Sequence, residues 1–102
     1  MLQLLRRRMA GRPPASGSYR AAPHVVAAVH GERTVLLDAR RGEYFGIDEV
    51  GGEIWRALET GATLAQVVDR LEAGYDAPRA VLERDAGEFL SLLQRKRLVS
   101  VA

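Results

Sequence analysis

Two hydrophobic patterns divide the chain, one typical of strands up to residue 47 and one typical of helices from residue 48 onward. In the first part, three short runs of apolar and β-branched residues are separated by the turn residues Gly31-Glu32 and Asp38–Gly42. Such tight connections predict an antiparallel meander. We expect its strands at residues 24–30, 34–37 and 43–47, with the third strand at an edge of the sheet.

The later segments repeat apolar residues at helical spacing and carry recognisable helix starts. Asp48 is suited to cap a first helix. Thr63 and Gln66 form the pattern of a capping box at the start of a second helix. Pro78 falls in the first turn of a third helix, which is expected to run to about residue 95. Three helices therefore follow the three strands.

This order predicts an α+β domain of the winged helix-turn-helix type, with a three-stranded antiparallel sheet placed before the helices. The pair Gly51-Gly52 costs the first helix about 1 kcal/mol per glycine relative to alanine, which indicates a close packing contact near its start. The apolar ending Leu98–Val101 is expected to dock back onto the domain. A chain of 102 residues has room for one such domain.

The first 22 residues have a different composition from the rest. Residues 11–18 are rich in Gly, Pro and Ser without apolar periodicity, which is typical of a flexible segment. Residues 1–22 also hold five of the fifteen basic residues and no acidic one, so residues 23–102 carry a net charge of about −3. We therefore expect a flexible basic tail at residues 1–22 and a mildly acidic folded domain at residues 23–102. Binding of the tail to an acidic partner or to a membrane surface is the alternative.

Candidate catalytic or metal-binding chemistry is missing from this pattern. The chain has no cysteine, which removes disulfides, thiolate metal sites and thiol nucleophiles and fits a cytoplasmic location. His24 and His30 have no third and fourth zinc ligand near them in the sequence. Phosphate-loop, dinucleotide and G-x-S-x-G motifs are absent, as is any apolar run long enough to span a membrane. The sequence predicts no enzyme, no metal and no cofactor.

Recognition remains, and the third helix is one candidate surface. A DNA-reading helix needs positive charge and base-reading side chains. Residues 77–90 carry Arg79 and Arg84 against three acidic residues and contain neither Asn nor Gln. A winged-helix DNA-binding regulator is therefore an alternative that this helix disfavours, and a structural subunit of a larger complex is a second alternative.

The other candidate surface is a groove between the edge strand and the third helix. An exposed strand edge can accept an extended peptide as a further strand. Tyr44 and Phe45 should face opposite sides of the sheet, and Gly46 permits close approach of a second backbone. A helix stripe that mixes apolar and acidic residues faces this edge, unless its apolar members belong to the periphery of the core. The stripe consists of Val81, Asp85, Glu88 and Leu92.

Residues 35–55 resemble the pyrroloquinoline quinone biosynthesis protein D family. The similar elements are Leu36-Leu37-Asp38, then Gly42-Glu43-Tyr44, then a helix cap followed by Gly51 and by Ile54-Trp55. The resemblance extends over residues 24–101. Asp48 replaces the family's usual asparagine, and Arg97 stands where the family has a helix-ending glycine.

This family comprises recognition elements for ribosomally made, post-translationally modified peptides. The resemblance implies that the leader of a precursor peptide, here one of the lasso class, binds as an added strand. It further implies delivery to a leader peptidase of the cysteine protease type and to an ATP-dependent macrocyclase, or to another modifying enzyme, with no nucleic acid and no membrane involved. Asp85 would anchor a polar or basic leader group, or instead brace the helix against Arg40 or Arg41. The expected leader-binding residues are Tyr44, Phe45, Gly46, Ile47, Val81, Asp85, Glu88, Phe89 and Leu92.

Overall fold

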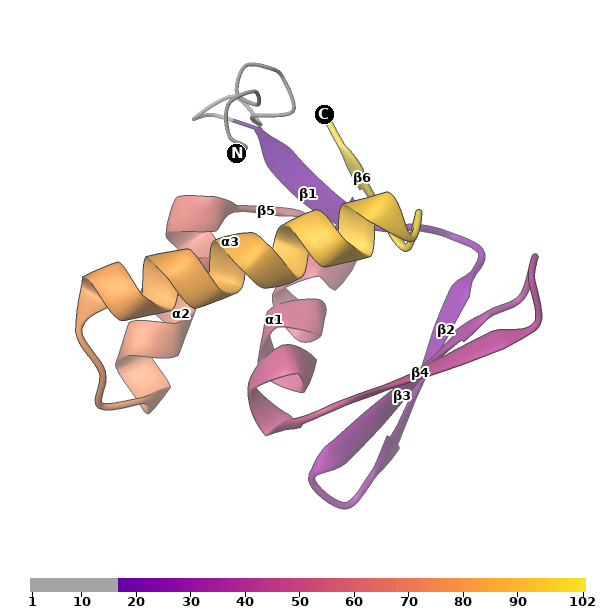
Figure 1. Cartoon of the computed structure of the whole chain (residues 1–102), viewed down its shortest axis with the longest axis horizontal. Helices are drawn as coiled ribbons and strands as arrows, with labels where there is room; N and C mark the ends of the chain where they lie inside the picture. Colours follow the sequence, from indigo (N-terminus) through magenta and orange to yellow (C-terminus); the bar gives the residue numbers. More distant parts are fainter. Residues whose placement is uncertain (1–16) are drawn as a thin grey trace.

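The structure, a computed structural model, describes residues 17–102 and consists of two small antiparallel sheets and three helices (Figure 1). This arrangement confirms the predicted α+β class. The predicted helices are present with nearly the expected bounds. They are α1 (Glu49–Glu59), α2 (Leu64–Gly74) and α3 (Arg79–Arg95).

The predicted meander is present as the sheet β2-β3-β4, whose strands are β2 (Val25–His30), β3 (Arg33–Asp38) and β4 (Glu43–Ile47). As expected, β4 lies at an edge. The β3–β4 turn forms because Oδ1 of the buried Asp38 accepts hydrogen bonds from the backbone N–H groups of residues 40 and 41, at 2.9 and 3.2 Å. Gly42 then takes a positive φ of 67°. The turn fixes where β4 begins and therefore where its free edge lies.

A second sheet, with the order β5-β1-β6, was not predicted. Its strands are β1 (Ser18–Ala21), β5 (Ala62–Thr63) and β6 (Val99–Val101). Tyr19 in β1 is only 3% exposed and belongs to the core, so the predicted tail boundary at residue 22 is wrong and the fold begins earlier. The tail prediction for residues 1–16 lies outside the described residues. Pairing of β6 with β1 confirms that the apolar C-terminal segment docks onto the domain.

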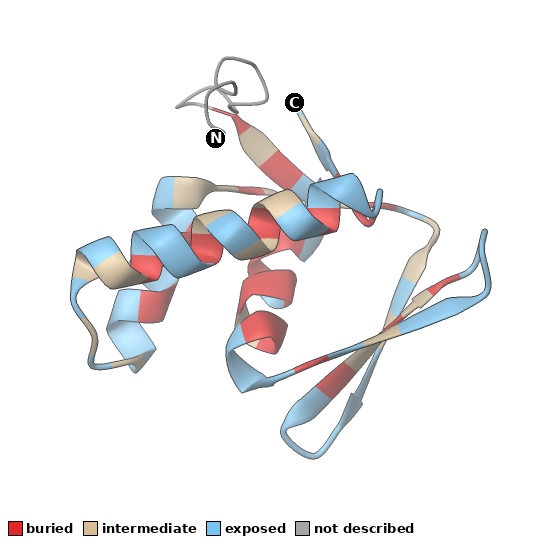
Figure 2. Cartoon of the chain, in the orientation of Figure 1, coloured by how far each residue is buried: buried red, intermediate tan, exposed pale blue. Residues whose placement is uncertain are grey.

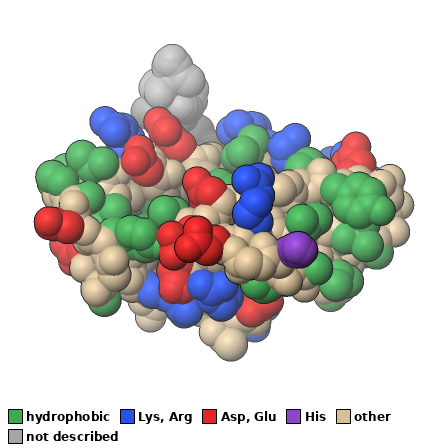
Figure 3. Space-filling view, turned by 90° about the horizontal axis from the view of Figure 1, so that it is seen from below, with side chains coloured by type: hydrophobic (Ala, Val, Ile, Leu, Met, Phe, Trp, Pro, Cys, Tyr) green, Lys and Arg blue, Asp and Glu red, His purple; other side chains and the backbone are tan. Residues whose placement is uncertain are grey.

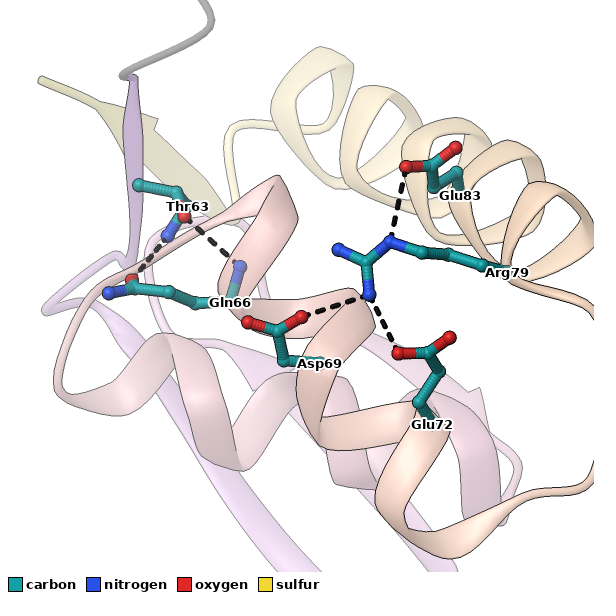
Figure 4. A network of polar contacts seen from close by, with 6 residues as sticks. All are labelled: Thr63, Gln66, Asp69, Glu72, Arg79 and Glu83. Carbon is teal, nitrogen blue, oxygen red and sulfur yellow. Dashed lines mark hydrogen bonds and ion pairs between the residues drawn. The ribbon is translucent and has the colours of Figure 1, made fainter.

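The helix ends follow the sequence signals. The Asp48 side chain accepts a hydrogen bond from the Gly51 N–H at 2.8 Å. Thr63 and Gln66 form the complete capping box, with bonds of 2.9 and 3.1 Å (Figure 4). After α3, Arg97 has a φ of 62°, the left-handed conformation in which a side chain is mildly strained and glycine is favoured.

The core lies where the three helices meet the inner face of the β2-β3-β4 sheet and the second sheet (Figure 2). Trp55 is 2% exposed, and it is among the largest side chains that are fully buried. On the sheet, Thr34, Leu36 and Asp38 alternate inward. Among residues 17–102, no helix is both long and apolar enough to cross a membrane.

The glycine pair of α1 packs closely, as the sequence indicated. A Cβ at Gly52 would lie 2.8 Å from Oγ1 of Thr34, which is itself buried. We expect Gly52→Ala to destabilise the domain by about 1 kcal/mol, because overpacking costs about 1–3 kcal/mol and exceeds the gain in helix propensity. Urea denaturation measures the change in the free energy of unfolding.

Gly87→Ala is the matched control for this prediction. Gly87 lies within α3, and a Cβ there would meet nothing within 4 Å. This substitution should stabilise the domain by about 0.5–1 kcal/mol. Changes of the same sign in both variants would contradict the close contact at Gly52.

Candidate functional site

A cleft of about 650 Å³ opens between β4, α1 and α3 and is closed at one end by the connection between α2 and α3. Its volume falls in the range of ligand-binding pockets. Most of its lining is apolar, and three aspartates contribute carboxylates. The lining residues are Gly46, Ile47, Asp48, Val50, Gly51, Ile54, Leu71, Tyr75, Asp76, Ala77, Val81, Leu82, Asp85, Ala86 and Phe89.

One side of the cleft is the end of the edge strand β4. Gly46 and Ile47 line the cleft, and β4 pairs only with β3 in the described part of the chain. Backbone N–H and C=O groups on the other side of β4 therefore have no strand partner. An extended peptide placed here could pair with β4 through its backbone and insert alternate side chains into the cleft.

The floor of the cleft depends on the first glycine of the pair in α1. A Cβ at Gly51 would lie 3.1 Å from Cβ of Ile47 and 3.3 Å from Cζ of Phe89. These distances are tighter than ordinary van der Waals contact, so a larger residue would push β4 and α3 apart. Gly51 thereby allows the two walls of the cleft to approach the start of α1.

Ion pairs between α2 and α3 position the other wall. Arg79, the first residue of α3, donates from Nη1 to Asp69 at 2.9 Å and to Glu72 at 2.7 Å (Figure 4). Its Nε lies 3.5 Å from Glu83 one turn later. The hydrogen bond to Asp69 raises the pKa of the Arg79 guanidinium above its already high value, so the group stays charged. This network holds the first turn of α3, and with it Val81, beside α2.

The charged residues that line the cleft are all acidic. They are Asp48, Asp76 and Asp85, and no Lys or Arg is among the lining residues. Burial raises the pKa of the Tyr75 hydroxyl, and the nearby negative charges, including that of Asp48, raise it further. Tyr75 therefore remains a neutral hydrogen-bond donor at neutral pH. Figure 3 shows acidic side chains gathered near the middle of the face seen from below, with hydrophobic side chains on both sides.

Asp85 is available to a ligand from this position. Its Oδ1 lies 3.3 Å from Nε of the neighbouring Arg84, and both side chains are well exposed. The alternative prediction, in which Asp85 braces α3 against Arg40 or Arg41, is wrong for the described structure, because neither arginine forms an ion pair with Asp85. Asp85 thus has no structural ion pair that links it to another element.

Of the nine residues expected to bind a leader, five line the cleft, namely Gly46, Ile47, Val81, Asp85 and Phe89. As predicted from strand alternation, Tyr44 and Phe45 face opposite sides. Tyr44 is 73% exposed, whereas Phe45 packs against the core with the Lys96 ammonium 5.0 Å from its ring centroid. Glu88 and Leu92 are also on α3, but neither is among the residues that line the cleft. The binding role of all nine residues stays a prediction.

Sequence reasoning missed the part of the cleft that comes from α1 and from the α2–α3 connection. Tyr75, Asp76 and Ala77 lie between two helices, where periodicity carries no signal. The acidic residue Asp48 was identified only as a helix cap. A residue that caps α1 directly after the edge strand necessarily lies at the end of β4. This position in the sequence could have identified Asp48 as a residue of the cleft.

The described residues offer no arrangement suited to a metal ion. No group of three or more His, Asp or Glu side chains within residues 17–102 is arranged to hold one. His24 lies beside Asp38, with Nε2 3.9 Å from Oδ1, and that carboxylate already serves the β3–β4 turn. The features of the cleft that could serve binding are the free edge of β4, the apolar lining and the three lining aspartates.

An open sheet edge beside an apolar cleft is a feature through which an extended peptide can add to a sheet as a further strand. The family model for coenzyme PQQ synthesis protein D (PqqD) matches residues 33–99. The chain belongs to this family. The match covers β3, β4, the three helices and the start of β6, and so includes every residue that lines the cleft.

Two solved structures resemble the whole folded domain. The first, TbiB1 in complex with the TbiA(beta) leader peptide, has a TM-score of 0.74 and 38% identity, covering 79% of this chain and 94% of that one. The second, a lasso peptide synthetase B1 complexed with the leader peptide, has a TM-score of 0.72 and 28% identity, covering 80% of this chain and 96% of that one. A search of curated proteins gives no match.

Proposed function

We propose that this protein is a non-catalytic recognition domain that binds the leader segment of a ribosomally made precursor peptide of the lasso class. The leader adds to β4 as an extended strand and inserts alternate side chains into the cleft. The observation that carries this proposal is the position of the cleft directly along the free edge of β4, where Gly46 and Ile47 belong to both. Both similar solved structures are complexes with leader peptides.

The chemistry of the cleft defines what such a leader should contain. Ile54, Leu82 and Phe89 provide an apolar surface for one or two large hydrophobic side chains. The three aspartates that line the cleft favour a basic or hydrogen-bond-donating group nearby. Asp85 is the expected anchor for that group, because it has no structural ion pair to another element.

The bound leader would be delivered to separate enzymes. We propose a leader peptidase of the cysteine protease type and an ATP-dependent macrocyclase as these partners. The outer face of the β2-β3-β4 sheet would remain open beside a bound strand, and Val26 and Tyr44 are exposed there at 56% and 73%. A partner enzyme could contact this face and the outward side chains of the leader together.

Fluorescence polarisation tests the binding role. Synthetic leaders of precursor peptides encoded beside this gene would be titrated with the protein, and scrambled peptides serve as controls. We expect saturable binding with a Kd of about 0.1–10 µM, corresponding to about −8 to −10 kcal/mol, and loss of binding on scrambling. Equal binding of native and scrambled leaders would contradict recognition, and no binding of any neighbouring leader would favour a structural subunit.

Leu92→Asp tests how far the bound peptide extends along α3. Leu92 lies beyond the cleft lining and is 38% exposed, so its replacement should leave the melting temperature nearly unchanged. We expect leader binding to weaken about tenfold, because an ionised carboxylate would replace an apolar contact. Titration and thermal denaturation of the same variant measure both properties. Unfolding of the variant would assign Leu92 to the core. Unchanged binding would show that the contact between the peptide and α3 does not extend beyond Phe89.

A DNA-binding role finds little support in α3. Arg79 is already engaged by three carboxylates of α2 and α3. Its charge is therefore largely neutralised before any phosphate could approach. The other arginine in the first half of α3, Arg84, lies beside Asp85.

A further inference from the structure

The side chain of Arg33 reaches over Gly46 on the outer face of the sheet. Arg33 is the first residue of β3, and it alternates outward with Val35, which pairs with Gly46. A Cβ at Gly46 would lie 3.6 Å from Nη2 of Arg33. The guanidinium therefore covers the place that a side chain at position 46 would occupy. Since Gly46 is on the edge strand, a strand added to β4 would lie about one strand spacing, roughly 4.8 Å, from the Gly46 backbone, and its outward side chains would lie beside this charge.

Arg33 also lacks a charged partner in the described part of the chain. None of the ion pairs within residues 17–102 includes it, and its cross-strand neighbour on β2 is His30. Its guanidinium presents five N–H donors in a planar fork that suits a carboxylate. The other side of β4 is different, because the cleft below it is lined by aspartates and by no basic residue.

We propose that Arg33 is a specificity-determining residue that selects a carboxylate on the outward face of the bound peptide, an inference that rests on the proposed function. Side chains of an added strand alternate between the cleft and the outer face. A residue that lies opposite Gly46 and points outward meets no side chain on β4 and can contact the Arg33 guanidinium. The site would thus select for charge on both faces of the bound peptide strand. Basic or neutral side chains are favoured on the face toward the cleft, and an acidic side chain is favoured on the outward face.

Charge reversal at Arg33 tests this inference. The leader of the precursor encoded beside this gene would be titrated against the wild-type protein and Arg33→Glu. We expect affinity to fall about fivefold in low salt, and the difference to shrink at high salt because the pair is exposed. Arg40→Glu is the matched control, because it makes the same charge change in the β3–β4 turn, away from Gly46. This control should change affinity less than about twofold.

Peptide variants locate the partner of Arg33. Each acidic residue of the leader would be replaced in turn by its amide and titrated against the wild-type protein and Arg33→Ala. One replacement should weaken binding to the wild-type protein and remove the difference between the two proteins. Additive effects at every position would overturn the proposal, as would equal losses from Arg33→Glu and Arg40→Glu. Failure of the wild-type protein to bind any leader is a distinct result, because it would contradict the proposed function itself.

Discussion

Val81→Asp is expected to abolish leader binding while the domain stays folded. Val81 is half-buried in the first half of α3 and lines the cleft, where Asp85 follows one turn later and Asp76 is already present. A further carboxylate would be covered by the bound peptide without a partner. An unpaired buried polar or charged group costs about 2–3 kcal/mol or more, so affinity should fall at least about 30-fold.

Val26→Asp is the matched control for this variant. Val26 lies on the far edge strand of the same sheet and is 56% exposed, so the identical substitution is placed outside the cleft. Its effect on leader affinity should be about twofold or less. Fluorescence polarisation gives the affinities, and circular dichroism shows whether both variants remain folded. A larger loss from Val26→Asp than from Val81→Asp would place the peptide on the outer face of the sheet.

Trp55→Ala should cause the largest loss of stability of any single substitution considered. Trp55 is 2% exposed and lies in α1, where it belongs to the buried core. Removing a buried aromatic side chain costs about 3–5 kcal/mol, because burial is lost and a cavity remains. Small domains are stable by only about 5–15 kcal/mol, so the variant should be close to unfolding at room temperature.

Urea denaturation of Trp55→Ala and Val50→Ala would separate core from surface effects. Val50 lies on the same helix but is 36% exposed. Its truncation should cost less than about 1 kcal/mol. Comparable losses in the two variants would contradict the expectation that Trp55 contributes more to stability than the exposed Val50.

The helices could be predicted because their signals are local. The Asp48 cap and the Thr63–Gln66 capping box each depend on residues three positions apart, and both formed as expected. The cost of Gly51-Gly52 correctly indicated close packing, although two of the contacting residues, Phe89 and Thr34, lie far away in the sequence. A local penalty thus revealed that a tertiary contact exists without identifying its partner.

The second sheet could not be predicted for the same reason. Its strands are two to four residues long, too short to show alternation, and they join segments from both ends of the folded domain. Tyr19 follows a Gly- and Ser-containing stretch that is typical of a flexible segment, yet its ring is buried. The cleft shows the same limit, since the approach of Asp76 to β4 depends on how α2 and α3 pack.

The pairing of β1 with β6 brings the two ends of the folded domain together. Ser18 and Ala102 exchange backbone hydrogen bonds, with N···O distances of 3.4 and 2.9 Å. No residue of β1, β5 or β6 lines the cleft. Another protein could therefore be fused at either end, or the ends could be joined by a short linker to give a circular permutant, without placing new chain across the peptide site. We therefore expect the proposed peptide binding to be retained when the domain is inserted as a module into a larger protein.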